Sequence, residues 1–402
     1  MIYDAARHEP VQSLEWNEDR ARRAIHEIVA DAEQAFTPER YWSPHPKDAD
    51  GIDSGAFTPL YHGALGVIWA LQHLRDLGAA ALSRDYAASL PRLQQDNRRW
   101  LDAQGNEATP AAFLMGDTPF LLMRLAAQPG AVAQADELER LIAGNLEHPS
   151  RELMWGSPGT LLAALFMHER TGADRWAVRF RSTARTLWSQ LQWSEQFGVR
   201  YWTQDLYGRQ STYLDAVHGF VATALPLIRG RGLLEPAEWD AWQECIVNTI
   251  GRTATWQGPH VNWRAFLVTP EGGSPRFLMQ FCHGAPGFVV CLGALPSDEL
   301  DPLLAAAGET IWSAGPLTKG SNLCHGTGGN GYAFLALHQR SGERRWLDRA
   351  RAFAMHGIAQ TQADRARYGQ GRYSLWTGDV GFAIYLWHCI EGTAAFPTLD
   401  VF

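Results

Sequence analysis

Apolar residues recur three and four positions apart along much of the chain, the spacing that places them on one face of an α-helix. The run Leu161, Leu162, Leu165 and Phe166 is an example. Alanine and leucine are abundant, whereas the alternating β-branched residues that are typical of strands are scarce. The pattern therefore predicts a chain of amphipathic helices.

A short glycine-rich turn comes before many of these helical segments, and it repeats along the chain. The run from Gly156 to Gly172 matches the run from Gly326 to Gly342, and each continues into an Arg-Trp pair. This is a repeat of helix, glycine stop and second helix. The first glycines of its seven copies are Gly63, Gly116, Gly156, Gly219, Gly284, Gly326 and Gly378.

A repeat of about 50 residues could be a propeller blade or a helical hairpin, and the helical periodicity favours the hairpin. Seven hairpins could form an open solenoid or close into a double-layered ring. A ring would collect the glycine turns at one end, so we predict an all-α fold, an α/α toroid of seven helical hairpins. We expect one domain over residues 1–402, with residues 1–50 as a helical extension packed on it.

Two of the turns contain a Cys-His pair, Cys282-His283 before Gly284 and Cys324-His325 before Gly326. Thiolate and imidazole are preferred ligands of Zn²⁺, and three protein ligands with one open position are typical of catalytic zinc. The pairs therefore predict a metal site built from two turns. The alternative is that both cysteines are simply buried beside glycine-rich turns.

Composition and net charge limit the expected cellular compartment and the expected kinds of binding partner. The chain has five cysteines, an odd number that fits a reducing cytoplasm better than a disulfide framework. Its net charge is −8 and no basic block stands out, so we expect no nucleic-acid or anionic-membrane partner. Neither a signal-peptide core nor an apolar run of about 18 residues is present. We expect a cytoplasmic monomer without a membrane span.

With these turns in view, the sequence resembles the lanthionine synthetase C (LanC-like) family over roughly residues 50 to 390. The family comprises lantibiotic cyclases and their LanC-like relatives. The resemblance implies an α/α toroid of seven hairpins, in agreement with the repeat. It also implies a zinc ion held by Cys282, Cys324 and His325, with a fourth position for water or the substrate thiol.

The resemblance implies further site residues. His218, before the fourth turn's glycine, corresponds to the family's catalytic histidine. Glu152 lies four residues before Gly156, where cyclases tend to have aspartate. His283 occupies a position that is often tyrosine in bacterial cyclases and histidine in LanC-like proteins; it is a second acid/base candidate or orients a zinc ligand. Lys319 matches a lysine of the glutathione-binding LanC-like proteins.

The implied reaction is conjugate addition of a cysteine thiol to dehydroalanine or dehydrobutyrine. Zinc would convert the thiol to a thiolate, and a histidine would protonate the resulting enolate. The substrate would be a dehydrated precursor peptide, made by a separate dehydratase, or glutathione with a dehydroamino acid. His283 and Lys319 favour the glutathione reaction slightly.

Three other functions remain open at this point. One is a regulatory protein that binds zinc with glutathione or a peptide but does not catalyse a reaction. Another is a protein prenyltransferase, which would bring an aspartate ligand and require a partner subunit. The third is a toroid glycosidase, but the turns contain no pair of carboxylates of the kind that such enzymes use.

Overall fold

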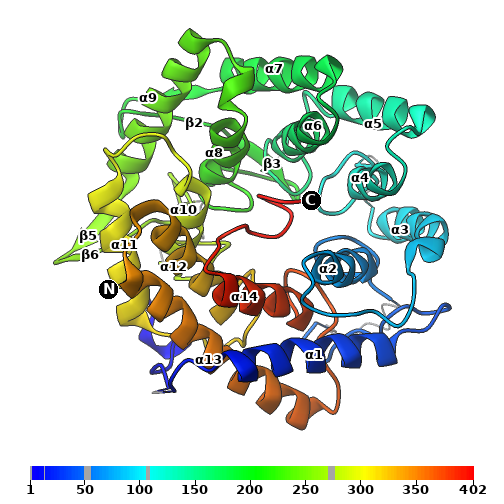
Figure 1. The fold of residues 1–402 in the computed structure, drawn as a ribbon. Helices are drawn as coiled ribbons and strands as arrows, with labels where there is room; N and C mark the ends of the chain where they lie inside the picture. The colour runs from blue at the N-terminus through cyan, green and yellow to red at the C-terminus, as the bar shows by residue number, and fades with distance from the viewer. Residues whose placement is uncertain (1, 13, 49–55, 106–108, 270–276) are drawn as a thin grey trace. The chain divides into compact units, whose positions relative to one another are not determined.

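The computed structural model describes residues 2–12, 14–48, 56–105, 109–269 and 277–402. These contain fourteen α-helices, three short 3₁₀-helices and three two-stranded antiparallel sheets (Figure 1). The predominance of helix predicted from the periodicity is therefore confirmed. The chain divides into two compact units. Unit 1 comprises Met1–Asp4, Thr109–Ser313 and Thr398–Phe402, and unit 2 comprises Ala5–Ala108 and Ala314–Pro397.

Each of the seven glycine turns is followed by a helix, as the repeat predicts. For six of them the first glycine is the N-cap residue; α4 begins two residues after Gly116, with Asp117 as its N-cap. These helices are apolar on almost every side; in α6, for example, all residues from Ser157 to Met167 are buried. The seven are α2 (Ala64–Asp76), α4 (Thr118–Ala127), α6 (Ser157–Thr171), α8 (Phe220–Arg229), α10 (Ala285–Leu292), α12 (Thr327–Ser341) and α14 (Asp379–Glu391).

A second helix follows in each of the first six repeats, and the closest packing is between α6 and α7 and between α12 and α13. In α7 the buried positions are restricted to one face, which is the arrangement expected of an outer helix. The six are α3 (Leu90–Ala103), α5 (Val132–Gly144), α7 (Asp174–Ser189), α9 (Pro236–Thr253), α11 (Asp301–Ala314) and α13 (Arg344–Tyr368).

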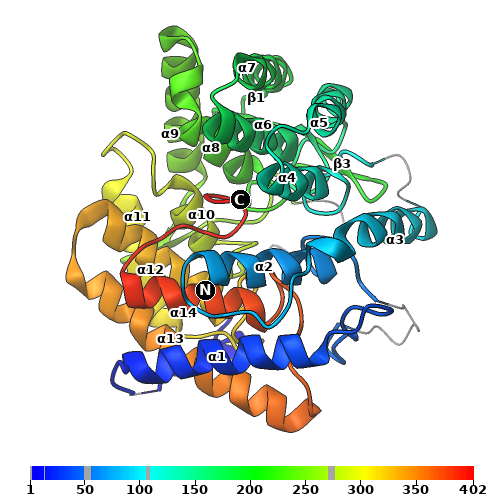
Figure 2. The same ribbon diagram turned by 45° about the vertical axis from the view of Figure 1, so that its right-hand side comes forward.

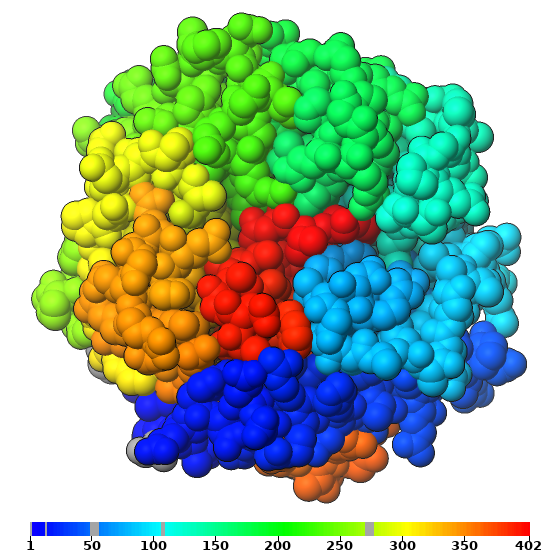
Figure 3. Space-filling view, in the orientation of Figure 1, coloured from blue at the N-terminus to red at the C-terminus, as the bar shows by residue number. Residues whose placement is uncertain are grey.

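The seventh repeat takes its second helix from the start of the chain. Residues 393–402, all described, form no helix after α14. Instead α14 packs against α1 (Glu18–Ala35), and both helices also contact α13. All three helices belong to unit 2 (Figures 2 and 3). The Asn17 side chain caps α1 by accepting a hydrogen bond from Arg20 N at 2.7 Å. The extension over residues 1–50 thus contributes a helix to the repeat pattern, while one domain over residues 1–402 stays a prediction.

Backbone hydrogen bonds join successive glycine turns inside each unit. In unit 1, Leu114 N donates to Met154 O and Leu153 N donates to Val217 O, both at 3.2 Å. These bonds connect turns two, three and four. In unit 2, Cys324 N donates to Trp376 O at 2.8 Å, and Trp376 N donates to Tyr61 O at 3.0 Å. Turn seven therefore joins turn six to turn one.

Three small hairpins, which the periodicity did not predict, lie between the helices of unit 1. Their strands are three residues long and pair antiparallel. Leu214 N donates to Ala265 O and Leu267 N donates to Thr212 O, both at 2.8 Å, so the segment before His218 is fixed to the segment after the third hairpin. The strands are β1 (Gln192–Ser194), β2 (Val199–Tyr201), β3 (Gln204–Leu206), β4 (Arg209–Ser211), β5 (Thr255–Gln257) and β6 (His260–Asn262).

The first cysteine turn requires both of its glycines. Gly284 has φ of +111°, and a Cβ there would lie 2.0 Å from Leu278 O. A Cβ at Gly287 would lie 2.0 Å from Phe281 O and 2.4 Å from Ala216 Cβ. The second glycine thus allows α10 to approach both its own turn and the turn that precedes α8.

Asp379, at the start of α14, provides a test of pH-dependent stability. The half-buried carboxylate accepts a hydrogen bond from Arg372 N at 2.8 Å. Burial raises its pKa to about 6, although Arg372 opposes the shift. Because the folded pKa is raised, ionisation of Asp379 lowers stability as the pH rises from about 4 to about 6. We expect Asp379→Asn to raise the free energy of unfolding at pH 7.5 by about 1–2 kcal/mol, a value reduced for partial exposure.

Urea denaturation at pH 4 and pH 7.5 checks this expectation. The gain in the variant should be present at pH 7.5 and nearly absent at pH 4. Glu391→Gln, at the exposed far end of α14, serves as a control that should alter neither midpoint. A gain of the same size at both pH values would contradict the assignment of the effect to Asp379 ionisation.

Candidate active site

The turns before α6 and α8 place a histidine against a buried carboxylate. His218 Nδ1 lies 2.8 Å from Glu152 Oε2. Glu152 has no exposed surface, and its oxygens accept hydrogen bonds from Met154 N at 2.9 Å and Trp155 N at 2.6 Å. Backbone N–H groups of its own turn therefore hold the carboxylate in place, and the carboxylate orients the imidazole of His218.

A second pair of the same kind lies beside the first. His283 Nδ1 lies 2.7 Å from Asp215 Oδ2. Asp215 is also fully buried, and its other oxygen accepts hydrogen bonds from Val217 N at 3.0 Å and His218 N at 2.7 Å. Unit 1 thus brings the predicted residues Glu152, His218 and His283 together, and Asp215 joins them.

The carboxylates determine the protonation of both imidazoles. Burial alone would lower the pKa of His218, but Glu152, Asp215 and Cys282 raise it above its ordinary value. Burial also opposes protonation of His283, but Asp215 and Cys282 raise its pKa to about 9. Burial would raise the pKa of Asp215, yet His283 and His218 hold it below its ordinary value. The His283–Asp215 pair therefore favours the charged forms of both partners, and the surroundings of His218 favour its protonated form.

Asp215 is not among the residues predicted from the sequence, although the repeat contains a signal for it. Asp215 lies four residues before Gly219, just as Glu152 lies four residues before Gly156. Asn322 occupies the same position in the sixth turn, and its Oδ1 accepts a hydrogen bond from His325 N at 3.0 Å. Aligning this position across the seven turns would have found Asp215.

The two cysteines of the Cys-His turns each accept a hydrogen bond within their own unit. In unit 1, Gln280 Nε2 donates to Cys282 Sγ at 3.0 Å. In unit 2, the Tyr61 hydroxyl donates to Cys324 Sγ at 2.8 Å. Such bonds suit sulfur atoms that act as thiolate ligands. Neither Gln280 nor Tyr61 is among the predicted residues. Tyr61 lies two residues before its turn glycine, the position that Cys282 and Cys324 occupy in their turns.

The predicted metal ligands are Cys282 from unit 1 and Cys324 and His325 from unit 2. Both cysteines are buried and His325 is half-buried. That these three residues together hold one metal ion stays a prediction. Lys319, predicted to bind glutathione, is exposed on the segment that leads into the second Cys-His turn.

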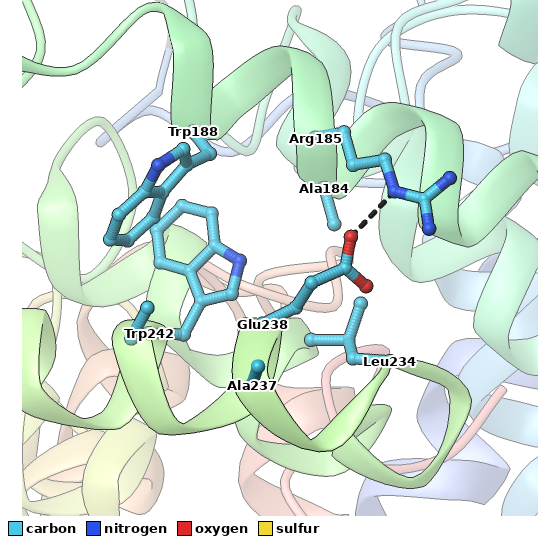
Figure 4. Close-up of a pocket in the computed structure, with 8 residues that line it drawn as sticks. Ala184, Arg185, Trp188, Leu234, Ala237, Glu238 and Trp242 are labelled. Carbon is cyan, nitrogen blue, oxygen red and sulfur yellow. Dashed lines mark hydrogen bonds and ion pairs between the residues drawn. The ribbon is translucent and has the colours of Figure 1, made fainter.

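A separate cavity of about 310 Å³ lies between α7 and α9 in unit 1 (Figure 4). Its wall includes Trp188 and Trp242, with the ion pair of Arg185 and Glu238 beside them at 2.6 Å. None of the predicted site residues lines it. The cavity is therefore distinct from the candidate active site.

The sequence matches the family model described as "Lanthionine synthetase C-like protein" over residues 49–401. The chain belongs to the lanthionine synthetase C-like family. The resemblance inferred from the turns is thereby confirmed.

Proteins similar to the chain include two curated proteins and one solved structure. Glutathione S-transferase LANCL1 of Danio rerio is 28% identical over 274 residues, which is 62% of each chain. LanC-like protein GCL1 of Arabidopsis thaliana is 40% identical over 90 residues, 21% of each chain. The matches therefore span less than two thirds of either relative.

One similar structure is that of nisin cyclase, with a TM-score of 0.60 and 13% sequence identity, over 93% of this chain and 95% of the other. At this identity the likeness shows the fold alone. The all-α toroid class predicted for this lanthionine synthetase C-like protein is confirmed by it. Among the described residues, none of the helices has the length and apolar character needed to cross a membrane.

Proposed function

We propose that this lanthionine synthetase C-like protein is a zinc-dependent enzyme that adds a cysteine thiol to dehydroalanine or dehydrobutyrine. The observation that supports this most directly is the His218–Glu152 pair, a buried acid/base pair in the same unit as Cys282. A protein that only binds its ligands would have little use for an imidazole whose orientation and charge are fixed in this way.

The donor set fits zinc. Two thiolates and one imidazole from Cys282, Cys324 and His325 would leave the fourth position open for a substrate thiol. Gln280 and Tyr61, each bonded to one sulfur, would orient the ligands. When bound, zinc would lower the pKa of the substrate thiol and hold its sulfur in position for attack.

The chain's own residues would complete the addition. The substrate thiol releases its proton to solvent, and its sulfur forms a bond to Cβ of the dehydroamino acid. The electron pair of the C=C bond moves onto Cα and its carbonyl as an enolate. His218, with Nδ1 engaged by Glu152, would deliver a proton from Nε2 to Cα. The raised pKa of His218 supports this, because the protonated form is the proton donor.

The substrates are of two kinds. Nisin cyclase shares the fold, which supports intramolecular addition in a dehydrated peptide supplied by a separate dehydratase. The zebrafish relative is named a glutathione S-transferase, which supports addition of glutathione to a dehydroamino acid. In that case the exposed Lys319 would bind a carboxylate of glutathione.

An assay with two substrates tests the proposal. The zinc-loaded protein is incubated with glutathione and a peptide that contains dehydroalanine, and separately with a dehydrated peptide that contains its own cysteine. Mass spectrometry detects the glutathione adduct, and thiol labelling detects ring closure. Acceleration of either reaction supports the enzyme. Zinc-loaded, folded protein that binds these ligands but accelerates neither reaction would favour the non-catalytic binding protein.

Tyr61→Phe tests how the hydrogen bond to Cys324 affects the metal. The substitution removes the hydroxyl but keeps the ring that packs on Trp376, with centroids 5.6 Å apart. We expect zinc affinity to fall by about 10- to 100-fold, because the bond stabilises the thiolate. Competition with a chromophoric chelator measures the affinity. Tyr373→Phe, which removes a hydroxyl bonded to Asp31 in the same unit, is the control. Equal affinities in both variants would refute the role of Tyr61.

A further inference from the structure

We infer that Asp215 is a positioning residue that organises both active-site histidines at once, through its two different oxygens. Oδ1 accepts hydrogen bonds from Val217 N and His218 N and so shapes the turn from which His218 projects. Oδ2 holds the ring of His283. This inference rests on the proposed function, because it assigns His283 a part in the same proton transfer.

Asp215 determines which nitrogen of His283 is available to a substrate. An ionised carboxylate only accepts hydrogen bonds, so Nδ1 of His283 must carry a proton. Nε2 is then the nitrogen that is not engaged in the pair. Glu152 has the same effect on His218. In both imidazoles, therefore, Nε2 is the nitrogen that is left to face a substrate.

The two histidine rings also share one aromatic neighbour. Tyr213 has its ring centroid 5.5 Å from that of His218 and 6.5 Å from that of His283. The two imidazoles thus lie around a single tyrosine ring in unit 1. The buried Asp215, two residues after Tyr213, contacts the ring of His283 and the backbone N–H of His218. His283 is consequently positioned as a second proton-transfer group beside His218.

Loss of Asp215 and loss of Glu152 should have different effects. Glu152 bonds to the ring of His218, whereas Asp215 bonds to the ring of His283 and to the backbone N–H of His218. Asp215→Asn is the informative substitution because it keeps the size of the side chain. The two backbone N–H groups require an acceptor, so the amide oxygen should face them and the NH₂ group should face His283.

Histidine ring NMR tests this directly. In zinc-loaded wild-type protein labelled with ¹⁵N-histidine, His283 should carry a proton on Nδ1, hydrogen-bonded to the Asp215 carboxylate, whether or not Nε2 is also protonated. Its signal is assigned by its loss in His283→Gln. In Asp215→Asn, Nδ1 faces a donor, so His283 should lose its Nδ1 proton and be protonated on Nε2 alone, while His218 keeps its Nδ1 proton. A wild-type His283 protonated only on Nε2, or an unchanged His283 pattern in Asp215→Asn, would overturn the inference.

Kinetics provide the second measurement. For Asp215→Asn we expect kcat to fall about 10- to 100-fold with KM for the acceptor changed less than about twofold, and with zinc content unchanged. Asp205→Asn, on the exposed surface of β3, should leave kcat and the NMR pattern unchanged. A wild-type kcat in Asp215→Asn would also overturn the inference. The NMR result does not depend on activity. An inactive wild type with the expected protonation of the histidine nitrogens would therefore refute the proposed function but support the positioning of His283.

Discussion

Substitution of Cys282 or Cys324 by alanine is expected to reduce the zinc content from about one ion per chain to nearly none, and to abolish thiol addition. The reason is the small number of protein ligands. Removing one of three leaves two, and the remaining thiolate and imidazole cannot hold the ion against water and buffer. Each cysteine also accepts a hydrogen bond, from Gln280 or Tyr61, which would lose its acceptor.

Elemental analysis after anaerobic reconstitution measures this effect. Cys245→Ala is the matched control, because Cys245 is buried on α9 in unit 1 and is outside the Cys-His turns. The control should keep its zinc and its activity. Zinc bound at full stoichiometry in both Cys282→Ala and Cys324→Ala would contradict the site. Folded wild-type protein that takes up no zinc would contradict the metal-dependent reaction altogether.

His218→Ala is the second substitution with a large expected effect. We expect kcat for thiol addition to fall by about 10²- to 10⁴-fold, the usual contribution of general acid–base catalysis. The zinc content should not change, because His218 is not one of the proposed ligands. Glu152 would keep its bonds to Met154 N and Trp155 N, so the third turn should retain its conformation.

Steady-state kinetics and zinc analysis of the same preparations separate the possible results. His338→Asn, on α12 and outside the turns, serves as the control and should match the wild type. A variant that keeps zinc but loses kcat identifies His218 as an acid/base residue. Retention of wild-type kcat in His218→Ala would exclude that role and would leave His283 as the candidate.

The helices and turns were predictable because their signals lie between close neighbours in the chain. The apolar spacing in Ser157–Thr171 and the glycine at Gly156 define α6 without reference to any other part of the protein. The three hairpins were missed because strands of three residues, such as Gln204–Leu206, are too short to show an alternating pattern. The Cys-His pairs were visible because their residue types are themselves the signal for metal binding.

The partners of the site residues could not be predicted in the same way. His283 pairs with Asp215, 68 positions away, and Cys324 with Tyr61, 263 positions away. The α1 helix, which matched no repeat, packs on α14 near the other end of the chain. The sequence by itself determined the helices, the seven glycine turns, the family and the types of the chemical groups, because these depend on local residues. The tertiary structure decided which carboxylate orients which imidazole and which hydroxyl bonds which sulfur. Those pairs depend on how turns that are distant in the sequence pack against one another.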